Sequence, residues 1–258
     1  MSAVRTVLVL CLASLCACEG SPGEARVKVY DPASAEPRWQ QTVSAQGFDV
    51  EKEAPDGVLR VATSDYCWDS NFVIDFDRET GARLDQQRRG ASAGTADPLG
   101  ALDPPTACAS GFVTQRSTLT NGERVDICAY TVDDELAVSN VADRRERFRL
   151  RPGGYRPLLV AGDQLLLSSA EPDRLETYSL LSGELLWSWT APEPYIYVAG
   201  ADTERVYLLA ETSHESYAFA LADGTAVWQK NLACDSLSLA GDVLVCHQRL
   251  RASSCDHD

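Results

Sequence analysis

The chain has 258 residues, and its 23 lysines and arginines face 38 aspartates and glutamates, which gives a formal net charge of −15 at pH 7. This charge argues against nucleic acid as a partner and against electrostatic attachment to anionic lipid head groups. The part of the chain expected to fold, after residues 1–24, has roughly 230 residues, which suffice for one large all-β domain and are too few for two.

Residues 1–17 have the pattern of a secretory signal peptide. One positive charge precedes an apolar run, residues 6–15, which is shorter than the ~20 apolar residues that span a membrane. The run ends at Leu15-Cys16-Ala17-Cys18, which resembles the bacterial lipoprotein box. This resemblance implies cleavage before Cys18 and lipid attachment to its sulfur; ordinary secretion with a plain thiol is the alternative. Residues 18–24 are predicted to be a flexible tether because they are rich in Gly, Ser and Pro.

A short motif then recurs five times. Each copy has an apolar strand end, a polar turn and a second strand that carries an aromatic residue four positions after a glycine slot; Asp85 breaks this rule in the second copy. The copies are Tyr30–Trp39, Phe76–Asp85, Ser139–Phe148, Tyr178–Trp187 and Phe219–Trp228. Recurrence of one supersecondary unit about every 40 residues is typical of a repeat architecture.

Short apolar runs between the motifs predict four strands in each unit, the pattern of a propeller blade. Residues 88–111 contain almost no large apolar side chain and are predicted to be an inserted loop, with a sixth blade as the alternative. Residues 25–40 supply only the last two strands of a unit, and residues 232–248 supply only the first two. We therefore predict an all-β propeller over residues 25–258, with five blades (six as the alternative), closed by joining the N- and C-terminal strands in one sheet.

The pattern Leu-Asp-x-x-Thr-Gly-x-x-x-Trp resembles the repeat of the pyrroloquinoline-quinone-like (PQQ-like) propeller family. In that family the tryptophan packs against the adjoining blade and docks the ring together. Carried over to this sequence, the resemblance assigns docking roles to Asp31, Trp39, Asp77, Gly81, Phe148, Gly183, Trp187, Gly224 and Trp228.

Family members divide into quinone-dependent dehydrogenases and non-enzymatic scaffolds, among them a lipoprotein of the bacterial outer-membrane barrel-assembly machinery. The dehydrogenases need a metal site, and the acidic pairs Asp75/Asp77 and Asp133/Asp134 have suitable oxygen ligands. Asp77 is better explained as a turn residue, and Asp133 and Asp134 as part of a hairpin tip. The histidines show no catalytic pattern: His214 is expected in a solvated loop, His247 ends a strand and His257 lies in the last three residues. We therefore predict no catalytic residue, no metal and no cofactor.

Six cysteines follow Cys18 and allow 15 disulfide pairings. Cys234 and Cys246 are equidistant from Ala240-Gly241-Asp242, so a hairpin turning there would place them opposite each other. Cys108 with Cys128 would pin the base of the inserted loop, and Cys67 with Cys255 would tie down the tail. Tyr66 and Trp68 form an aromatic cluster that is either a contact surface or packing around a disulfide.

The expected function is that of a non-catalytic lipoprotein of the bacterial cell envelope that presents a propeller surface to envelope proteins of unknown identity. The alternative is an enzyme, or a binder of a small molecule or carbohydrate, that uses the central channel. The membrane is contacted through the lipid anchor only. The outer membrane is preferred, because Glu19 is not the aspartate that favours retention in the inner membrane.

Overall fold

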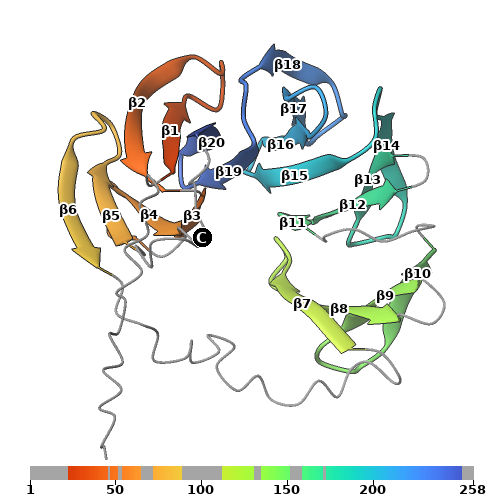
Figure 1. Ribbon diagram of the computed structural model, residues 1–258. Coiled ribbons are helices and arrows are strands. Elements are labelled where there is room, and N and C mark those ends of the chain that lie inside the picture. Colours follow the sequence, from red (N-terminus) through yellow and green to blue (C-terminus); the bar gives the residue numbers. More distant parts are fainter. Residues whose placement is uncertain are drawn as a thin grey trace, which may run out of the picture.

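The computed structural model describes residues 23–45, 47–51, 54–64, 72–88, 112–130, 135–151, 159–170 and 173–251. Every regular element in these ranges is a β-strand, and the strands form five four-stranded antiparallel sheets arranged as the blades of a propeller (Figure 1). The predicted fold class and blade count are confirmed. No helix in the described ranges is long and apolar enough to cross a membrane.

Four blades are continuous in the chain. Blade 1 consists of β3 (Gly47–Glu51), β4 (Val58–Ser64), β5 (Phe72–Asp77) and β6 (Arg83–Arg88). Blade 2 consists of β7 (Phe112–Thr118), β8 (Arg124–Tyr130), β9 (Glu135–Asn140) and β10 (Glu146–Leu150). Blade 3 consists of β11 (Leu159–Ala161), β12 (Gln164–Ala170), β13 (Asp173–Ser179) and β14 (Leu185–Thr190). Blade 4 consists of β15 (Ile196–Ala201), β16 (Arg205–Ala210), β17 (Glu215–Ala220) and β18 (Ala226–Asn231).

The closing blade joins the two ends of the described chain. Its strand order is β19 (Ser236–Ala240), β20 (Val243–Arg251), β1 (Glu24–Tyr30) and β2 (Pro37–Ser44). In the register of this sheet Val27 pairs with His247 of β20 on one side and with Gln41 of β2 on the other. The predicted joining of N- and C-terminal strands is therefore confirmed. The element bounds differ slightly from expectation, because Glu24 of the predicted tether begins β1 and Arg88 of the predicted loop ends β6.

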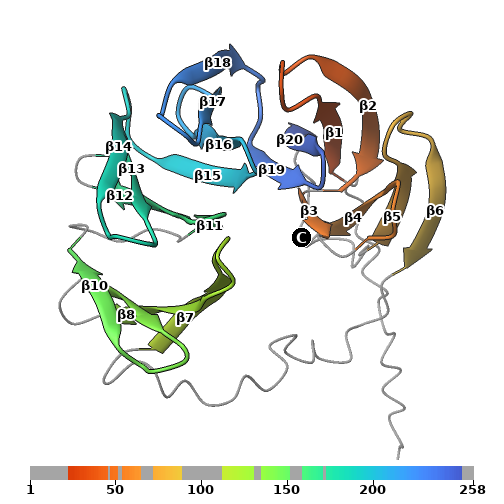
Figure 2. The ribbon, with the colours of Figure 1, turned by 180° about the vertical axis from the view of Figure 1, so that it is seen from behind.

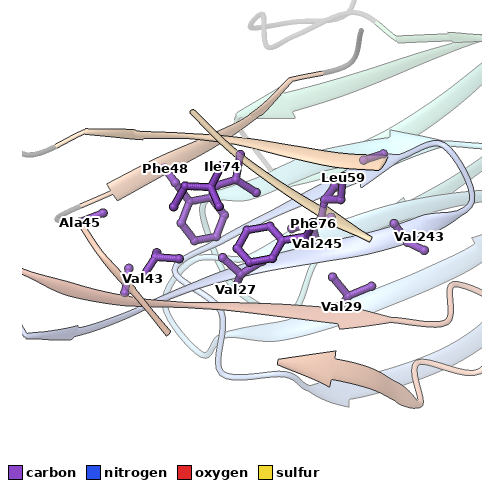
Figure 3. Packing of buried hydrophobic residues seen from close by; sticks show 13 residues of the cluster. Val27, Val29, Val43, Ala45, Phe48, Leu59, Ile74, Phe76, Val243 and Val245 are labelled. Carbon is purple, nitrogen blue, oxygen red and sulfur yellow. The ribbon is translucent and has the colours of Figure 1, made fainter. Parts of the chain in front are cut away.

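Apolar clusters fill the junctions between neighbouring blades. Alternate side chains of each strand point to opposite faces of its sheet, so a blade can contribute one apolar face to each neighbour. The cluster between the closing blade and blade 1 includes Val27, Val29, Phe48, Leu59 and Phe76, which point toward one another (Figure 3). Similar clusters lie between the closing blade and blade 4, between blades 3 and 4, and between blades 2 and 3.

Blades 1 and 2 are the two ends of the resulting arc. Both views show them apart from each other (Figures 1 and 2), and no apolar cluster of the described residues joins them. The expectation of a ring closed all the way round is therefore not met by the described part of the chain. We call this fifth junction the seam; its residues explain why the apolar packing stops there.

Candidate functional site

The turn between the third and fourth strands of each blade is built by its first residue. In blade 1 the Asp77 carboxylate accepts hydrogen bonds from the backbone N–H groups of Glu79 (3.2 Å) and Thr80 (2.8 Å) and from the Thr80 hydroxyl (2.7 Å). The Thr80 backbone N–H is the main cause that lowers the pKa of Asp77. Asp31 makes the same bonds to Ala33 and Ser34. Both aspartates therefore act as turn residues.

The fifth residue of each turn adopts a left-handed backbone conformation. Its φ is 71° at Gly81, 78° at Gly183 and 71° at Gly224, and two copies use other residues, Ala35 (54°) and Arg144 (58°). Glycine is favoured at three of these positions for a second reason, which is space. A Cβ atom on Gly81 would lie 2.5 Å from the Trp39 ring, and one on Gly224 would lie 2.7 Å from the Trp187 ring.

An aromatic side chain from the outer strand of one blade lies in the turn of the next blade; we call this turn, as a receptor, the docking notch. Trp39 donates its indole N–H to the carbonyl of Arg78 (2.8 Å), Trp187 to that of Leu221 (2.8 Å) and Trp228 to that of Pro32 (2.9 Å). In each case the acceptor is the second residue of the turn. Phe148, which has no donor, packs against Gly183. Four notches thus each receive an aromatic ring from the preceding blade.

The notch of blade 2 has the same backbone. The N–H of Arg144 donates to the carbonyl of Asn140 (3.0 Å), and the N–H of Val141 donates to that of Arg124 (2.9 Å). The equivalent bond in blade 4, from Leu221 to Glu204, measures 2.8 Å. A pocket of about 510 Å³ lies at this notch, lined by Gly122, Glu123, Arg124, Asn140, Val141, Ala142 and Asp143.

The residue that the repeat would place in this notch is Asp85 of blade 1. Asp85 is exposed, and its carboxylate accepts hydrogen bonds from the N–H of Gln86 and the side-chain amide of Gln87, both at 2.8 Å. All six residues of β6 are exposed, whereas β14 and β18 each bury their tryptophan. The described residues of blade 1 therefore send no aromatic side chain to the notch of blade 2.

The face of blade 1 at the seam is charged. Cross-strand register aligns Glu51, Arg60, Asp75 and Asp85 in one row across β3 to β6. Arg60 binds Asp75 through two parallel hydrogen bonds of 2.7 and 2.8 Å, and this contact lowers the pKa of Asp75. The position of Asp75 is held by Val29 in the closing blade and by Val138 in blade 2. At this position of blade 1, a planar, bidentate ion pair thus stands where the other two blades have a buried valine.

The face of blade 2 at the seam is also held by ion pairs within the blade. Arg116 binds Asp126 through two hydrogen bonds of 2.6 and 2.9 Å, and Asp126 is 0% exposed. The buried carboxylate of Glu135 accepts bonds from Arg149 (2.5 Å) and Arg151 (2.6 Å), and the bond from Arg149 is the main cause that lowers its pKa. A buried carboxylate needs such partners. Because each face satisfies its own charges, neither requires an apolar neighbour across the seam.

The acidic pairs Asp75/Asp77 and Asp133/Asp134, considered above as oxygen ligands, do not assemble a metal site in the described part of the chain. Within it, no group of three or more His, Cys, Asp or Glu side chains could hold a metal ion. Asp75 is engaged by Arg60, and Asp133 and Asp134 lie outside the described residues.

The histidines have structural surroundings. Nδ1 of His214 lies 2.6 Å from the carbonyl oxygen of Cys234, and the residue is half-buried. His214 lies in the connection between β16 and β17, as expected, but it is not fully solvated, because the backbone that leads into the closing blade lies against its ring. His247 is buried edge-on against Phe48, with ring centres 4.5 Å apart. His257 lies outside the described residues.

The predicted disulfide between Cys234 and Cys246 is present, with a Cα–Cα distance of 5.4 Å. Its expected geometry was wrong. Ala240 pairs with Val243, which places Leu237, not Cys234, opposite Cys246 in the hairpin. Cys234 instead lies ahead of β19, where Ala233 has a positive φ of 51° that redirects the chain.

Several predicted residues and segments lie outside the described residues. They include the signal peptide, the lipidation site Cys18, most of the tether and of the inserted loop, the aromatic pair Tyr66 and Trp68, and Cys67, Cys108 and Cys255. Cys128 itself is buried and disulfide-bonded, and its partner is not among the described residues.

The repeat geometry agrees with a family match. Residues 73–245 match the family model described as "Outer membrane protein assembly factor BamB". The chain belongs to this family. The predicted kinship with PQQ-like propeller repeats is thereby confirmed, since the model is one of PQQ repeats. A search of curated protein sequences gave no match.

Solved structures similar to this chain are distant. The β-propeller domain of Cps50 (Swd1) from Myceliophteria thermophila is 12% identical, with 86% of this chain and 90% of that chain covered and a TM-score of 0.37. Apo AztD from Citrobacter koseri is also 12% identical, over 92% of this chain, with a TM-score of 0.40. KlHsv2 with a replaced loop is 8% identical over 82% of this chain, with a TM-score of 0.38. The chain spans 62% of the AztD chain and 64% of the KlHsv2 chain. These similarities carry no argument about function.

Proposed function

We propose that this protein is a non-catalytic scaffold of the bacterial cell envelope, anchored by lipid at Cys18, that offers its propeller surface to other envelope proteins. The observation that carries the proposal is the family match, because the description of that family names an assembly factor of the outer membrane. Propeller folds host many unrelated functions. A second line of support is therefore taken from the structural roles of the repeat residues.

The conspicuous residues of the motif have structural tasks, which fits a scaffold. The aspartates build turns, the glycines admit the incoming rings and the aromatics join neighbouring blades. The charged residues at the seam are engaged in ion pairs within their own blades. The hydrogen bonds and ion pairs of these side chains therefore stabilise the blades and their junctions.

The anchor is tested by Cys18→Ser. The full chain with this change should move from the membrane fraction into the soluble envelope fraction, because the substituted residue cannot form the thioether bond to lipid. Cys11→Ser, within the leader, is the matched control and should leave the distribution unchanged. Equal membrane association of both variants would contradict lipidation at Cys18.

The scaffold role is tested by crosslinking in intact cells, followed by mass spectrometry of the proteins that copurify with the full chain. The expected result is a small set of envelope proteins that disappears when the crosslinker is omitted. Recovery of no partner, together with a quinone, metal or sugar bound to the purified protein, would overturn the proposal in favour of a binder or enzyme that uses the central channel.

A further inference from the structure

We propose that the docking notch of blade 2 binds a tryptophan carried on an extended, acidic strand of another protein. This inference rests on the proposed function, because it assigns a partner surface to the scaffold. Its support comes from three features of the notch: a preformed backbone, the lack of an aromatic side chain from the described residues of blade 1, and exposed arginines beside the pocket.

The first feature is that the notch keeps its receptor geometry. The bonds from Val141 to Arg124 and from Arg144 to Asn140 reproduce those of the notches of blades 1 and 4, which contain tryptophan. In those notches the indole N–H donates to the carbonyl of the second turn residue. Here that carbonyl belongs to Val141, and no described residue donates a hydrogen bond to it. An indole N–H entering the pocket would find the acceptor already oriented.

The second feature is that the described residues of blade 1 do not supply the ring. Its candidate residue is Asp85, a carboxylate engaged by Gln86 and Gln87. The face of blade 1 at the seam also carries the Arg60–Asp75 ion pair. An apolar contact between this face and blade 2 would require desolvation of these charged groups. The occupant must therefore come from outside the described blades.

The third feature is the charge around the pocket. Arg144 stands where three other notches have glycine, and it is exposed. Ala35 at the same position of the closing blade tolerates a docked Trp228, so a Cβ atom here does not exclude an indole. The pocket is lined by Arg124 and by two acidic residues, Glu123 and Asp143. Arg147 pairs with Glu123 and Arg145 pairs with Asp143, which leaves the positive charges of Arg124 and Arg144 in excess. On a protein of net charge −15, this arginine group favours a strand with acidic residues next to its tryptophan, and a guanidinium can lie over the indole face.

The occupant is a strand, because every aromatic that docks within the protein sits on the outer strand of a sheet: Trp39 on β2, Phe148 on β10, Trp187 on β14 and Trp228 on β18. A second copy of this chain is disfavoured, because its docking tryptophans Trp39, Trp187 and Trp228 are already bonded to notches of their own molecule. We therefore commit to a different protein, and self-association becomes an outcome of the test.

The probe is a fluorescein-labelled peptide with the sequence of residues 34–43, which contains Trp39 among polar residues. Its Arg38 is replaced by Glu, so that an acidic residue precedes the tryptophan. The matched control peptide also carries Trp39→Ala. Binding is measured by fluorescence anisotropy with the full chain. We expect at least tenfold tighter binding of the tryptophan peptide, and a several-fold loss of affinity when Arg144 is replaced by Glu.

The blocking variant is Ala142→Trp, which fills the pocket from an exposed position of the turn. It should abolish tryptophan-dependent binding while leaving the melting temperature of the protein unchanged. A matched Ala222→Trp change alters the equivalent turn residue of blade 4, whose notch already holds Trp187, and should leave peptide binding intact. This second variant separates pocket blocking from a general effect of a new surface tryptophan.

Equal affinity for the two peptides, absence of binding, or retained binding in A142W would overturn the inference. Concentration-dependent dimerisation of the wild type that A142W removes would overturn it in favour of a second copy. Crosslinking in cells separates this inference from the proposed function. If the same partners are recovered with the wild type and with A142W, the proposed binding at the notch is contradicted and the scaffold role is retained. Peptide binding without any partner in cells would support the notch and count against the scaffold.

Discussion

Asp85 and Arg144 are the two residues that the repeat would bring together at the seam, and no ion pair joins them among the described contacts. In the closing blade and blade 1 the same two positions hold Trp39 and Gly81, which are in direct contact. At the seam the aromatic has become a carboxylate and the glycine has become an arginine. Both halves of one docking contact are therefore changed at the junction where apolar packing stops.

The docking aromatics should dominate the stability of the blade junctions. Trp187→Ala removes a buried ring and its hydrogen bond to the Leu221 carbonyl, so we expect the free energy of unfolding to fall by about 3–5 kcal/mol. Asp85→Ala, at the equivalent position of blade 1, should change it by less than about 0.5 kcal/mol, because the residue is exposed. Urea titration measures both, and similar losses for the two variants would contradict the assignment of the seam.

The glycines of the turns should differ according to the space around them. Gly224→Ala would place a Cβ atom 2.7 Å from the Trp187 ring at a φ of 71°, and we expect a loss of about 2–5 kcal/mol from backbone strain and overpacking together. Gly122→Ala is the matched control, with a φ of 83° and nothing within 4 Å of the added atom; only the backbone cost of about 1–2 kcal/mol applies. Thermal melts that rank the two variants in the opposite order would refute this account.

His247 should make the junction between the closing blade and blade 1 sensitive to acid. Burial lowers its pKa below 6.5, since its Nε2 has no hydrogen-bond partner in the described structure and Phe48 covers the ring. The charged groups that act on it are Asp235 and Asp49, which favour protonation, and Arg249, which opposes it.

The sign of the pH effect follows from proton binding. Below pH 6.5 the unfolded chain takes up a proton at His247 that the folded chain does not, so stability is complete above pH 6.5 and decreases as the pH falls toward the folded pKa. The slope should reach at most about 1.4 kcal/mol per pH unit. Unfolding titrations between pH 7.5 and 5 should show this slope in the wild type and a flatter profile in His247→Leu. Parallel profiles would exclude His247 as the cause.

The disulfide between Cys234 and Cys246 should stabilise the closing blade, because it ties the segment ahead of β19 to β20. The cysteines are 12 residues apart, and a loop of this size is worth about 3 kcal/mol through the reduced entropy of the unfolded chain. The double change to alanine should lower the free energy of unfolding by about this amount in oxidising buffer. An undiminished stability of the double variant would show that the bond contributes nothing.

The repeat made the blades predictable from sequence, because Trp39, Trp187 and Trp228 occupy the same position of the motif and each docks on the next blade. Asp85 was visible as an exception, but its consequence depended on cross-strand register: only the pairing of Asp75 with Arg60 and with Asp85 shows that a charged row faces the seam. The notch of blade 2 was missed for the same reason, since Val141 and Arg124 become neighbours through a backbone bond between two separate turns. The Cys234–Cys246 pair was predicted on a wrong register: the hairpin pairs Leu237 with Cys246, and the positive φ of Ala233 redirects the chain just ahead of Cys234.

The closing blade also constrains the order in which the protein can fold. β1 must pair with β20, which follows all the other described strands in the chain, so the β1–β2 hairpin keeps an open backbone edge until β20 has been made. Blades 1 to 4 contain only neighbouring strands and can form as they emerge, whereas the closing blade requires contact between the two ends of the chain, a slow step because of its loop entropy. During that interval the edge of β1 is a site where a folding helper, or a second unfinished chain, could add a strand.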